Sequence, residues 1–214
     1  WYNPVMAQLS ITTTAPLPSL PLALYSSECI AYTIVEPFGE CDIVVGLDNE
    51  LITQLITLSQ DTSDEALART SDSVRFKDSS SYESWFHTDR TPFALIHQET
   101  SSLMALVWIG PKPLGMMPPK LQNSAMTLEA PKTGSSDLWD TVSFRSYPPY
   151  RGKGFMTSFM EYLMQIYCER FPTHHLWAGI DRDNAASRAF ATKLGFSAHG
   201  EDDGTSERIT MIRM

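Results

Sequence analysis

The apolar positions along this chain repeat with two periods, and each period predicts one kind of element. Alternating or short apolar runs bounded by turn residues predict strands at residues 29–35, 42–46, 93–97 and 103–109. The last of these segments is almost wholly apolar, which is typical of a strand in the middle of a sheet. Because only a short polar stretch separates the last two segments, we expect them to form a hairpin.

Helical spacing of apolar residues first occurs at residues 51–56, and Asp48 ahead of them is a suitable N-cap. Residues 61–80 are polar and predict a connector without regular structure. Residues 80–83 read Ser-Ser-Tyr-Glu, a capping box that predicts a short helix directly after the connector.

Strand and helix signals alternate in the second half of the chain. The predicted elements are a strand at 140–146, a helix at 155–171, a strand at 174–181 and a helix within 184–196. We expect Asp183 to cap the second of these helices and Gly195 to end it in the left-handed conformation.

Two segments lack a clear period. Residues 1–28 contain several prolines and predict an irregular arm, so that a single domain would cover residues 29–214. Residues 110–136 hold five prolines and predict a long loop inside that domain. Such a loop either borders a binding site or is a flexible excursion, and both interpretations stay open.

Composition narrows the class of protein. With 214 residues, 43% hydrophobic and 11% aromatic, the chain can bury a full core as one domain. A net charge of −9 argues against a nucleic-acid partner, which needs a basic footprint, and mildly favours cationic substrates, although solubility explains it as well. No apolar run reaches the ~18–20 residues that span a bilayer, so we expect no membrane partner.

The three cysteines, Cys29, Cys41 and Cys168, lack any Cys-x-x-Cys pairing. This pattern favours reduced thiols in the cytoplasm, with the nucleus as the alternative, and neither a disulfide scaffold nor a metal site. The prolines near the N-terminus and the absence of a basic segment before them argue against a signal peptide.

The most informative segment is residues 147–155, which read Tyr-Pro-Pro-Tyr-Arg-Gly-Lys-Gly-Phe and join a predicted strand to a predicted helix. Glycines let several backbone N–H groups point at one spot, and the helix adds its positive dipole end, so the turn suits a phosphate or pyrophosphate. A P-loop is disfavoured because Lys153 is followed by Gly154 instead of Ser or Thr. A dinucleotide fingerprint is disfavoured because its third glycine is Thr157.

The turn resembles motif A of the GNAT acetyltransferase superfamily, whose loop reads Arg/Gln-x-x-Gly-x-Gly/Ala. Arg151 and Gly154 match this pattern, and Met156 departs from it at the last position. Residues 184–196 resemble motif B of the same superfamily, at the expected distance downstream. Each motif is short, but their order and spacing together are specific.

The resemblance implies a fold and a cofactor. The expected fold is α/β (α+β), a mixed and mostly antiparallel sheet of about six to seven strands with splayed central strands, flanked by about four helices. The implied co-substrate is acetyl-coenzyme A, with no metal. The resemblance implies that the residues binding acetyl-coenzyme A, including its pantetheine and pyrophosphate, are Phe144, Arg145, Ser146, Arg151, Gly152, Lys153, Gly154, Phe155, Met156, Asn184, Ser187 and Phe190.

Acetyl transfer also needs a general base and a group that protonates the leaving thiolate. Asp140 is the first choice for the base, because histone acetyltransferases carry a Glu at the corresponding strand position. The alternative bases are two carboxylates and two imidazoles: Glu129, Asp181, His87 and His97. An ordered water could also take this role. His174 and His175 begin a strand and are expected to be structural or exposed.

Many members of the superfamily use a motif B tyrosine as the acid, but the residue here is Phe190. Tyr150, or alternatively Tyr147, is then the candidate donor, unless the thiolate leaves unprotonated.

The resulting hypothesis is an N-acetyltransferase that transfers an acetyl group from acetyl-coenzyme A to a primary amine of a small molecule, an amino acid or a protein. The alternative is a catalytically silent acyl-coenzyme A binding module, motivated by Met156 and Phe190. The sequence does not identify the acceptor, and it leaves open whether the protein forms a homodimer.

Overall fold

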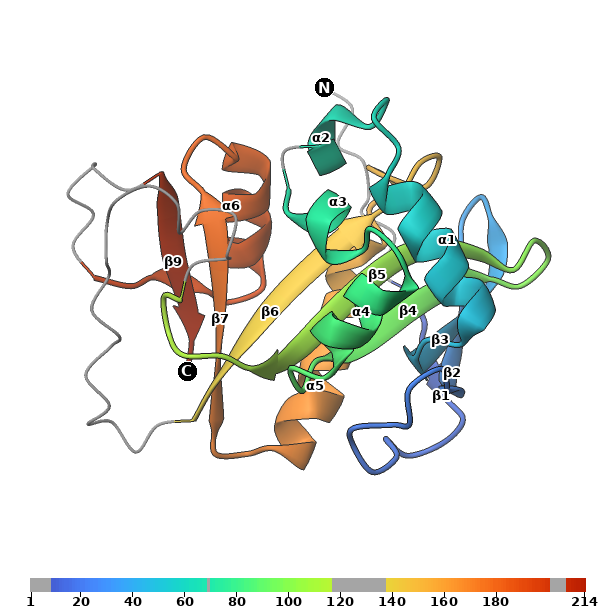
Figure 1. Ribbon diagram of the computed structural model, residues 1–214. Helices are drawn as coiled ribbons and strands as arrows, with labels where there is room; N and C mark the ends of the chain where they lie inside the picture. Colours follow the sequence, from blue (N-terminus) through green and yellow to red (C-terminus); the bar gives the residue numbers. More distant parts are fainter. Residues whose placement is uncertain (1–8, 69, 117–137, 201–206) are drawn as a thin grey trace, which may run out of the picture. The chain divides into compact units, whose positions relative to one another are not determined.

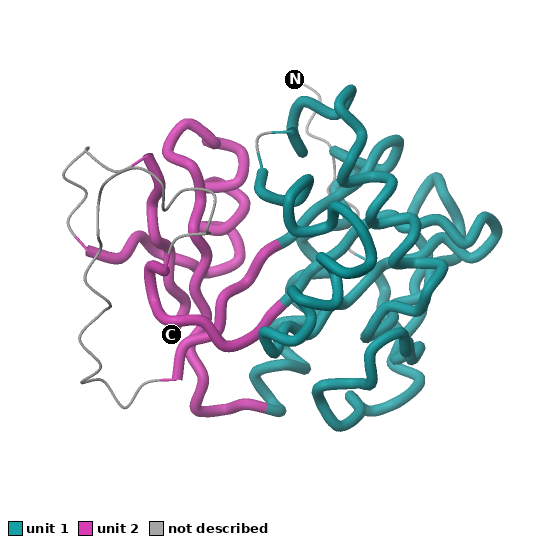
Figure 2. The backbone as a smooth tube through the Cα atoms, in the orientation of Figure 1, with its two compact units in different colours: residues 1–108, 144–170 teal, residues 109–143, 171–214 magenta. Residues whose placement is uncertain are grey.

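The computed structural model describes residues 9–68, 70–116, 138–200 and 207–214. Contacts between Cα atoms divide the chain into two compact units (Figure 2). The first unit comprises Trp1–Trp108 and Phe144–Arg170, and the second comprises Ile109–Ser143 and Phe171–Met214. The single domain expected over residues 29–214 stays a prediction.

The described strands form one mixed, mostly antiparallel sheet in the order β1-β2-β3-β4-β5-β6-β7-β9-β8. The strands are β1 (Thr12–Thr13), β2 (Ser27–Val35), β3 (Gly39–Gly46), β4 (Thr91–His97), β5 (Ser102–Pro111), β6 (Leu138–Ser146), β7 (His174–Asp181), β8 (Ser197–Ala198) and β9 (Arg208–Arg213). Figure 1 labels all but the short β8. The predicted α/β fold is confirmed.

The expected count of six to seven strands is too low, since nine strands are present among the described residues. Two of them, β1 and β8, are only two residues long. Strand β1 lies within the segment that was expected to be an irregular arm, where Thr12 and Thr13 pair with Tyr32 and Ala31 of β2. Such short edge strands carry almost no periodic signal, so sequence patterns do not reveal them.

Six helices are described, two more than expected. They are α1 (Asn49–Ser59), α2 (Glu65–Ala68), α3 (Asp72–Arg75), α4 (Ser79–Phe86), α5 (Met156–Arg170) and α6 (Ala185–Lys193). The two additional helices are α2 and α3, and both lie in the connector at residues 61–80 that was predicted to lack regular structure. Each has only four residues, about one turn, which is too short to show helical periodicity.

The predicted N-cap of α1 is confirmed, because the Asp48 side chain accepts a hydrogen bond from the Leu51 backbone N–H. The predicted capping box at residues 80–83 is wrong. Helix α4 begins at Ser79, and its N-cap is Asp78, whose side chain accepts from the Ser81 N–H. A carboxylate is a good N-cap and also favours the positive end of the helix dipole, which explains the earlier start.

The core of the first unit is rich in aromatic rings. Phe76 follows α3 directly and makes edge-on contacts with Trp85 of α4 and Trp108 of β5, at centroid distances of 5.0 and 5.8 Å. Leucines of α1 and side chains of β3, β4 and β5 belong to the same buried cluster. Burial of each such side chain is worth about 1.5–3 kcal/mol, so the cluster holds the short helices of the connector against the sheet.

Helix α5 also belongs to the first unit and lies behind the strands in the view of Figure 1. Its buried side chains are Phe159, Met160, Leu163, Met164 and Tyr167. Its two buried methionines thus serve as core residues, as expected from the flexible shape of that side chain.

The second unit is built on strand β7. Residues Leu138–Thr141 of β6 pair in parallel with the first half of β7, His174 to Trp177, and β9 pairs with β7 in antiparallel fashion on the other side. Strand β7 continues to Asp181 beyond the parallel ladder. No helix among the described residues is long and apolar enough to cross a membrane.

Candidate active site

The turn between β6 and α5 is held by buried aromatic residues at both ends. Tyr147 is 0% exposed and Phe155 is 1% exposed. The Tyr147 backbone N–H donates to the Met104 carbonyl of β5 at 3.0 Å, and the Tyr147 carbonyl accepts from the N–H groups of Tyr150 and Arg151 at 2.9 and 3.1 Å. The glycines between these anchors are therefore kept in a defined conformation near the surface.

Both glycines of the turn adopt left-handed conformations, with φ of +77° at Gly152 and +88° at Gly154. A Cβ atom built at either position would have no atom within 4 Å, so the conformation, and not lack of space, requires glycine here. In the described part of the chain, no acceptor is bonded to the backbone N–H groups of Gly152, Lys153 and Gly154. Such clustered donors ahead of a helix form an anion-binding concavity.

Met156, which departs from the motif A pattern, is the first residue of α5. Its φ is not among the positive values of the chain. A side chain is therefore tolerated at this position, and the departure does not distort the turn.

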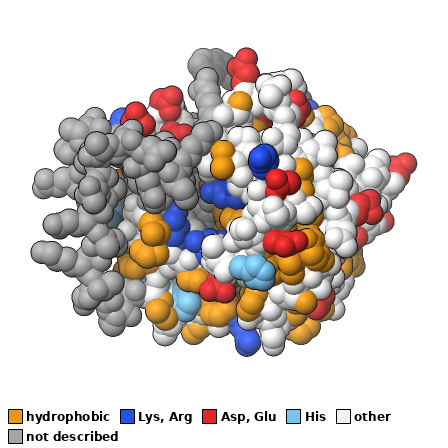
Figure 3. Space-filling model, viewed as in Figure 1, with side chains coloured by type: hydrophobic (Ala, Val, Ile, Leu, Met, Phe, Trp, Pro, Cys, Tyr) orange, Lys and Arg blue, Asp and Glu red, His pale blue; other side chains and the backbone are white. Residues whose placement is uncertain are grey.

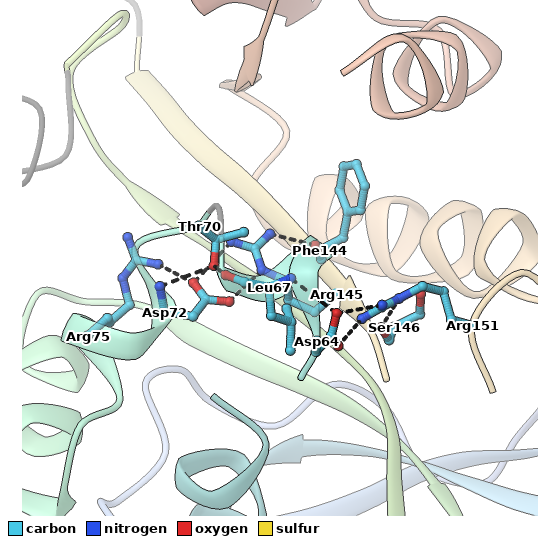
Figure 4. A network of polar contacts seen from close by, with 9 residues as sticks. All are labelled: Asp64, Leu67, Thr70, Asp72, Arg75, Phe144, Arg145, Ser146 and Arg151. Carbon is cyan, nitrogen blue, oxygen red and sulfur yellow. Dashed lines mark hydrogen bonds and ion pairs between the residues drawn. The ribbon is translucent and has the colours of Figure 1, made fainter. Parts of the chain in front are cut away.

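The Arg151 side chain is held by other residues instead of extending freely from the turn. Its guanidinium forms a two-point ion pair with Asp64, with Nη1 to Oδ1 at 2.8 Å and Nη2 to Oδ2 at 2.6 Å, and its Nε donates to the Ser146 carbonyl at 3.0 Å (Figure 4). This geometry is the strong bidentate form of an arginine–carboxylate pair. The hydrogen bonds from Arg151 lower the pKa of Asp64.

A second pair of the same kind lies beside it (Figure 4). Arg145 donates from Nε and Nη2 to the two carboxylate oxygens of Asp72, at 2.5 and 3.0 Å, and Arg75 donates to the same carboxylate at 2.9 Å. The guanidinium groups of Arg145 and Arg75 both lie over the ring of Trp108, at 5.1 and 5.3 Å from its centroid. Asp72, which is 1% exposed, thus carries two cations that share one aromatic ring.

The two arginines bind alternate carbonyl groups at the end of β6. Nη1 of Arg145 donates to the Phe144 carbonyl at 2.7 Å, as Nε of Arg151 does to the Ser146 carbonyl. The end of β6 and the turn are therefore tied to the connector that contains α2 and α3. This network joins four of the predicted cofactor residues, Phe144, Arg145, Ser146 and Arg151, to two aspartates that the sequence did not suggest.

Asp140 is 1% exposed, and its Oδ2 lies 2.6 Å from Nδ1 of His174. The imidazole is more accessible, with its side chain 22% exposed. A carboxylate that is ionised only accepts hydrogen bonds, and with such a partner Nδ1 of the ring would donate and Nε2 would be the nitrogen that can accept a proton. His174 is thus the more accessible member of the pair, and the expectation that His174 is structural or exposed stays a prediction.

The two candidate acids differ in their surroundings. Burial raises the pKa of Tyr147 far above its ordinary value. Its hydroxyl group has no hydrogen-bond partner among the described residues. Tyr150 is 8% exposed and packs edge-on against Phe38 at 4.8 Å. Tyr150 is thus the more exposed of the two.

Helix α6 begins differently from the prediction. Its N-cap is Asn184, not Asp183, and the Asn184 side chain accepts from the Ser187 N–H at 3.0 Å. Asp183 lies one residue too early for its side chain to reach the N–H groups of the first turn. Gly195 ends the helix region with φ +84°, as predicted. Phe190, another predicted cofactor contact, is half-buried on this helix.

The alternative bases are distributed over the molecule. Both ring nitrogens of His97 are engaged, with the Phe38 carbonyl at 2.6 Å and the Thr100 hydroxyl at 2.7 Å. Asp181 forms an ion pair with Arg208. His87 is exposed. Glu129 lies outside the described residues.

Asp64, Asp72 and His174 are the polar partners that sequence reasoning missed. Asp64 precedes Arg151 by 87 residues, and both aspartates belong to a connector whose composition is that of an ordinary polar loop. Only their burial distinguishes them, and burial is not visible in a single sequence.

Basic side chains gather near the middle of the face shown in Figure 3, although the chain as a whole is acidic. Within the described ranges, no group of three or more His, Cys, Asp or Glu side chains is placed to hold a metal ion.

Comparisons with known proteins give the class. A family model described as an acetyltransferase (GNAT) domain matches residues 62–197, which is more than half of the chain. The GNAT domain of PAT from S. lividans superimposes with a TM-score of 0.57 at 14% identity, over 85% of this chain and 94% of that one. No curated protein sequence matches significantly.

Two further solved structures are similar. A GnaT-family acetyltransferase from Bordetella pertussis gives a TM-score of 0.54 at 13% identity, over 80% of this chain and 95% of that one. The ribosomal-protein-S5-alanine acetyltransferase from Vibrio fischeri gives 0.51 at 14% identity, over 80% and 92%. At such low identities these structures support the fold alone. On the family model, the chain belongs to the GNAT acetyltransferase family.

Proposed function

We propose that the protein is an N-acetyltransferase that uses acetyl-coenzyme A and acts on a primary amine. The observation that carries the proposal is the turn after β6, where three consecutive backbone N–H groups, from Gly152 to Gly154, have no acceptor in the described part of the chain. These donors and the start of α5 suit the pyrophosphate of coenzyme A.

The rest of the cofactor would lie along the end of β6. In this proposal the backbone of residues 144–146 binds pantetheine and polarises the acetyl carbonyl. Arg145 and Arg151 donate to the carbonyls of Phe144 and Ser146, and these bonds would hold the end of β6 in the conformation that this role needs.

In the reaction, the amine nitrogen loses a proton, attacks the thioester carbonyl carbon, and the carbon–sulfur bond breaks to release a thiolate. We assign the proton transfer to Asp140 acting through His174, because the carboxylate itself is almost completely buried. Nε2 of His174 accepts the proton, directly or through one water, while Asp140 orients the ring and stabilises its charge. Tyr150 is the proposed donor to the thiolate, since Phe190 has no hydroxyl group.

The acceptor class stays open among small amines, amino acids and protein amines. The similar structure from Vibrio fischeri is named for an alanine of a ribosomal protein, so alanine and alanine-containing peptides belong in the panel of candidate acceptors. The net charge of −9 adds cationic amines to that panel.

The test has two stages. Calorimetric titration with coenzyme A should show binding, and incubation with acetyl-coenzyme A and the amine panel should release free thiol in proportion to acetylated amine. Binding without thiol release on any amine would favour the silent acyl-coenzyme A binding module. Absence of binding would contradict both functions.

A further inference from the structure

We propose that Asp64 is a positioning residue for coenzyme A binding: by fixing Arg151, it sets the conformation in which the glycine turn presents its backbone donors. The inference rests on the proposed function for its ligand. Its structural part, that Asp64 orders the turn, concerns the protein alone.

The Asp64 carboxylate is held in one position by several hydrogen bonds. Its side chain is 3% exposed. Oδ1 accepts from the backbone N–H groups of Ala66 and Leu67, at 3.1 and 3.2 Å, in addition to Nη1 of Arg151. The carboxylate is therefore both the cap of α2 and the partner of Arg151. It has one defined position from which to hold the guanidinium.

Arg151 is bonded to the end of β6 through its backbone and its side chain. Its backbone N–H donates to the Tyr147 carbonyl and its Nε donates to the Ser146 carbonyl. Both attachments close the chain back on the end of β6, and the ion pair with Asp64 holds the side chain in the orientation that the Nε bond needs. Gly152 follows Arg151 directly. The direction of the chain through Gly152, Lys153 and Gly154 therefore depends on these hydrogen bonds of Arg151.

An opposite interpretation is that Asp64 merely occupies Arg151 until a phosphate displaces it. The structure disfavours this exchange. Losing the guanidinium would leave a nearly buried carboxylate without a cation, which is strongly unfavourable. The two interpretations predict opposite signs for the effect of removing the charge, and an experiment can therefore separate them.

The test variant is Asp64→Asn, and the matched control is Asp61→Asn. Asparagine keeps the capping oxygen for Ala66 and Leu67 and removes the charge that binds Arg151. Asp61 lies three residues earlier on the same connector and is exposed, and its side chain accepts hydrogen bonds from the hydroxyl group and N–H of Ser63. Both substitutions remove one negative charge, so a general charge effect would appear in both variants.

The first measurement needs no ligand. Amide hydrogen exchange, followed by NMR, reports the N–H groups of Tyr150 and Arg151, which donate to Tyr147. We expect at least about tenfold faster exchange of these two amides in Asp64→Asn, because their hydrogen bonds depend on local closure of the turn. Exchange in Asp61→Asn should match the wild type. Unchanged exchange in Asp64→Asn would overturn the proposal, whatever the protein binds.

The second measurement is a double-mutant cycle on coenzyme A affinity, with Asp64→Asn, Arg151→Gln and the double variant. We expect the dissociation constant to rise about 10- to 100-fold in Asp64→Asn, and the second substitution to add less than about twofold in the double variant. Additive effects would mean that Asp64 acts independently of Arg151. Tighter binding of coenzyme A by Asp64→Asn would support displacement and refute positioning.

The two claims fail separately. If the wild-type protein does not bind coenzyme A, the proposed function is wrong, and the exchange measurement alone decides whether Asp64 orders the turn. If the wild type binds but the cycle is additive, the function stands and the role of Asp64 is refuted.

Discussion

The two ends of strand β6 are equipped for different tasks. At the end of β6, charged side chains are bonded to one another and to carbonyls, and the backbone N–H groups of Gly152, Lys153 and Gly154 have no acceptor among the described residues. At its start, the polar feature is a side-chain pair, Asp140 with His174, in which the carboxylate is buried and the imidazole is partly exposed. The first arrangement suits the binding of an anion and the second suits the transfer of a proton.

Helix α5 follows β6 and helix α6 follows β7, and the N-termini of these two helices also differ. The N–H groups ahead of α5 have no acceptor among the described residues, whereas the Ser187 N–H in the first turn of α6 is bonded by Asn184. A helix whose first backbone N–H groups are bonded by a capping side chain has fewer donors left to bind an anion. Changes at the turn should therefore alter affinity, changes at the start of β6 should alter turnover, and changes at the cap of α6 should alter stability.

The largest effect is expected at the start of β6. Asp140→Asn removes the charge that stabilises a protonated His174, so kcat should fall by about 10² to 10⁴ while coenzyme A affinity stays unchanged. Steady-state kinetics on an acceptor found by the panel, together with calorimetry, measure the two quantities.

The matched variants are His174→Gln, which should lose a similar factor non-additively with Asp140→Asn, and His175→Gln, which should lose little. His175 is adjacent and contacts Trp139 instead. Retention of most activity in Asp140→Asn would remove this pair from the mechanism and leave Asp181 or a water chain as candidates.

The next effect in size is expected at the turn. Gly154→Val forces a β-branched residue into a φ of +88°, which costs about 1–3 kcal/mol where the conformation is kept and otherwise reshapes the turn. Coenzyme A affinity should fall by about 100-fold or more, measured by calorimetric titration. Because the turn lies near the surface, the circular dichroism spectrum should be preserved.

Gly200→Val is the control for backbone strain. Gly200 also has a positive φ, +82°, and open space around its Cβ position, but it follows β8 in the second unit. This variant should carry a similar strain without a change in coenzyme A affinity. Equal affinities of Gly154→Val and the wild type would show that the turn does not hold the pyrophosphate.

A smaller effect is expected at the cap of α6. Asn184→Ala leaves the Ser187 N–H without its acceptor and should lower the free energy of unfolding by about 1 kcal/mol. Coenzyme A affinity should change by less than about twofold, because this oxygen already serves the helix. Urea denaturation measures the free energy of unfolding, and calorimetry measures the affinity. The variant Asn184→Asp keeps the capping oxygen and should therefore be as stable as the wild type. A large loss of affinity with stability retained would instead support the predicted role of Asn184 in cofactor binding.

The smallest effect is a pH dependence. Arg151 lowers the pKa of Asp64 in the folded protein, so the ion pair stabilises the fold fully above the unfolded pKa of about 3.9. The stabilisation is lost as the pH falls through the lowered folded value. The difference in unfolding free energy between the wild type and Asp64→Asn should accordingly be constant near neutral pH and shrink below about pH 4. A difference that persists at lower pH would mean that the charge of Asp64 is not its source.

Much of the fold was predictable from local patterns. Strand β7 has the predicted bounds, and α5 begins and ends one residue inside its predicted range. These elements are long and their apolar period is clear. The turn at Gly152 and Gly154 was recognisable because only glycine adopts its backbone conformation without strain. The errors fell on two-residue strands, single-turn helices and the choice between neighbouring caps, where several residues serve equally well.

The sequence by itself determined the order of the main elements, the glycine turn and the family, because each depends on residues close together in the chain. Only the tertiary structure decided which polar side chains act on that turn. Asp64 and Asp72 reach Arg151 and Arg145 across more than 70 residues of chain, and His174 reaches Asp140 through the parallel pairing of β6 with β7. Such contacts arise from the packing of distant segments, and packing brings together residues that no spacing along the sequence relates.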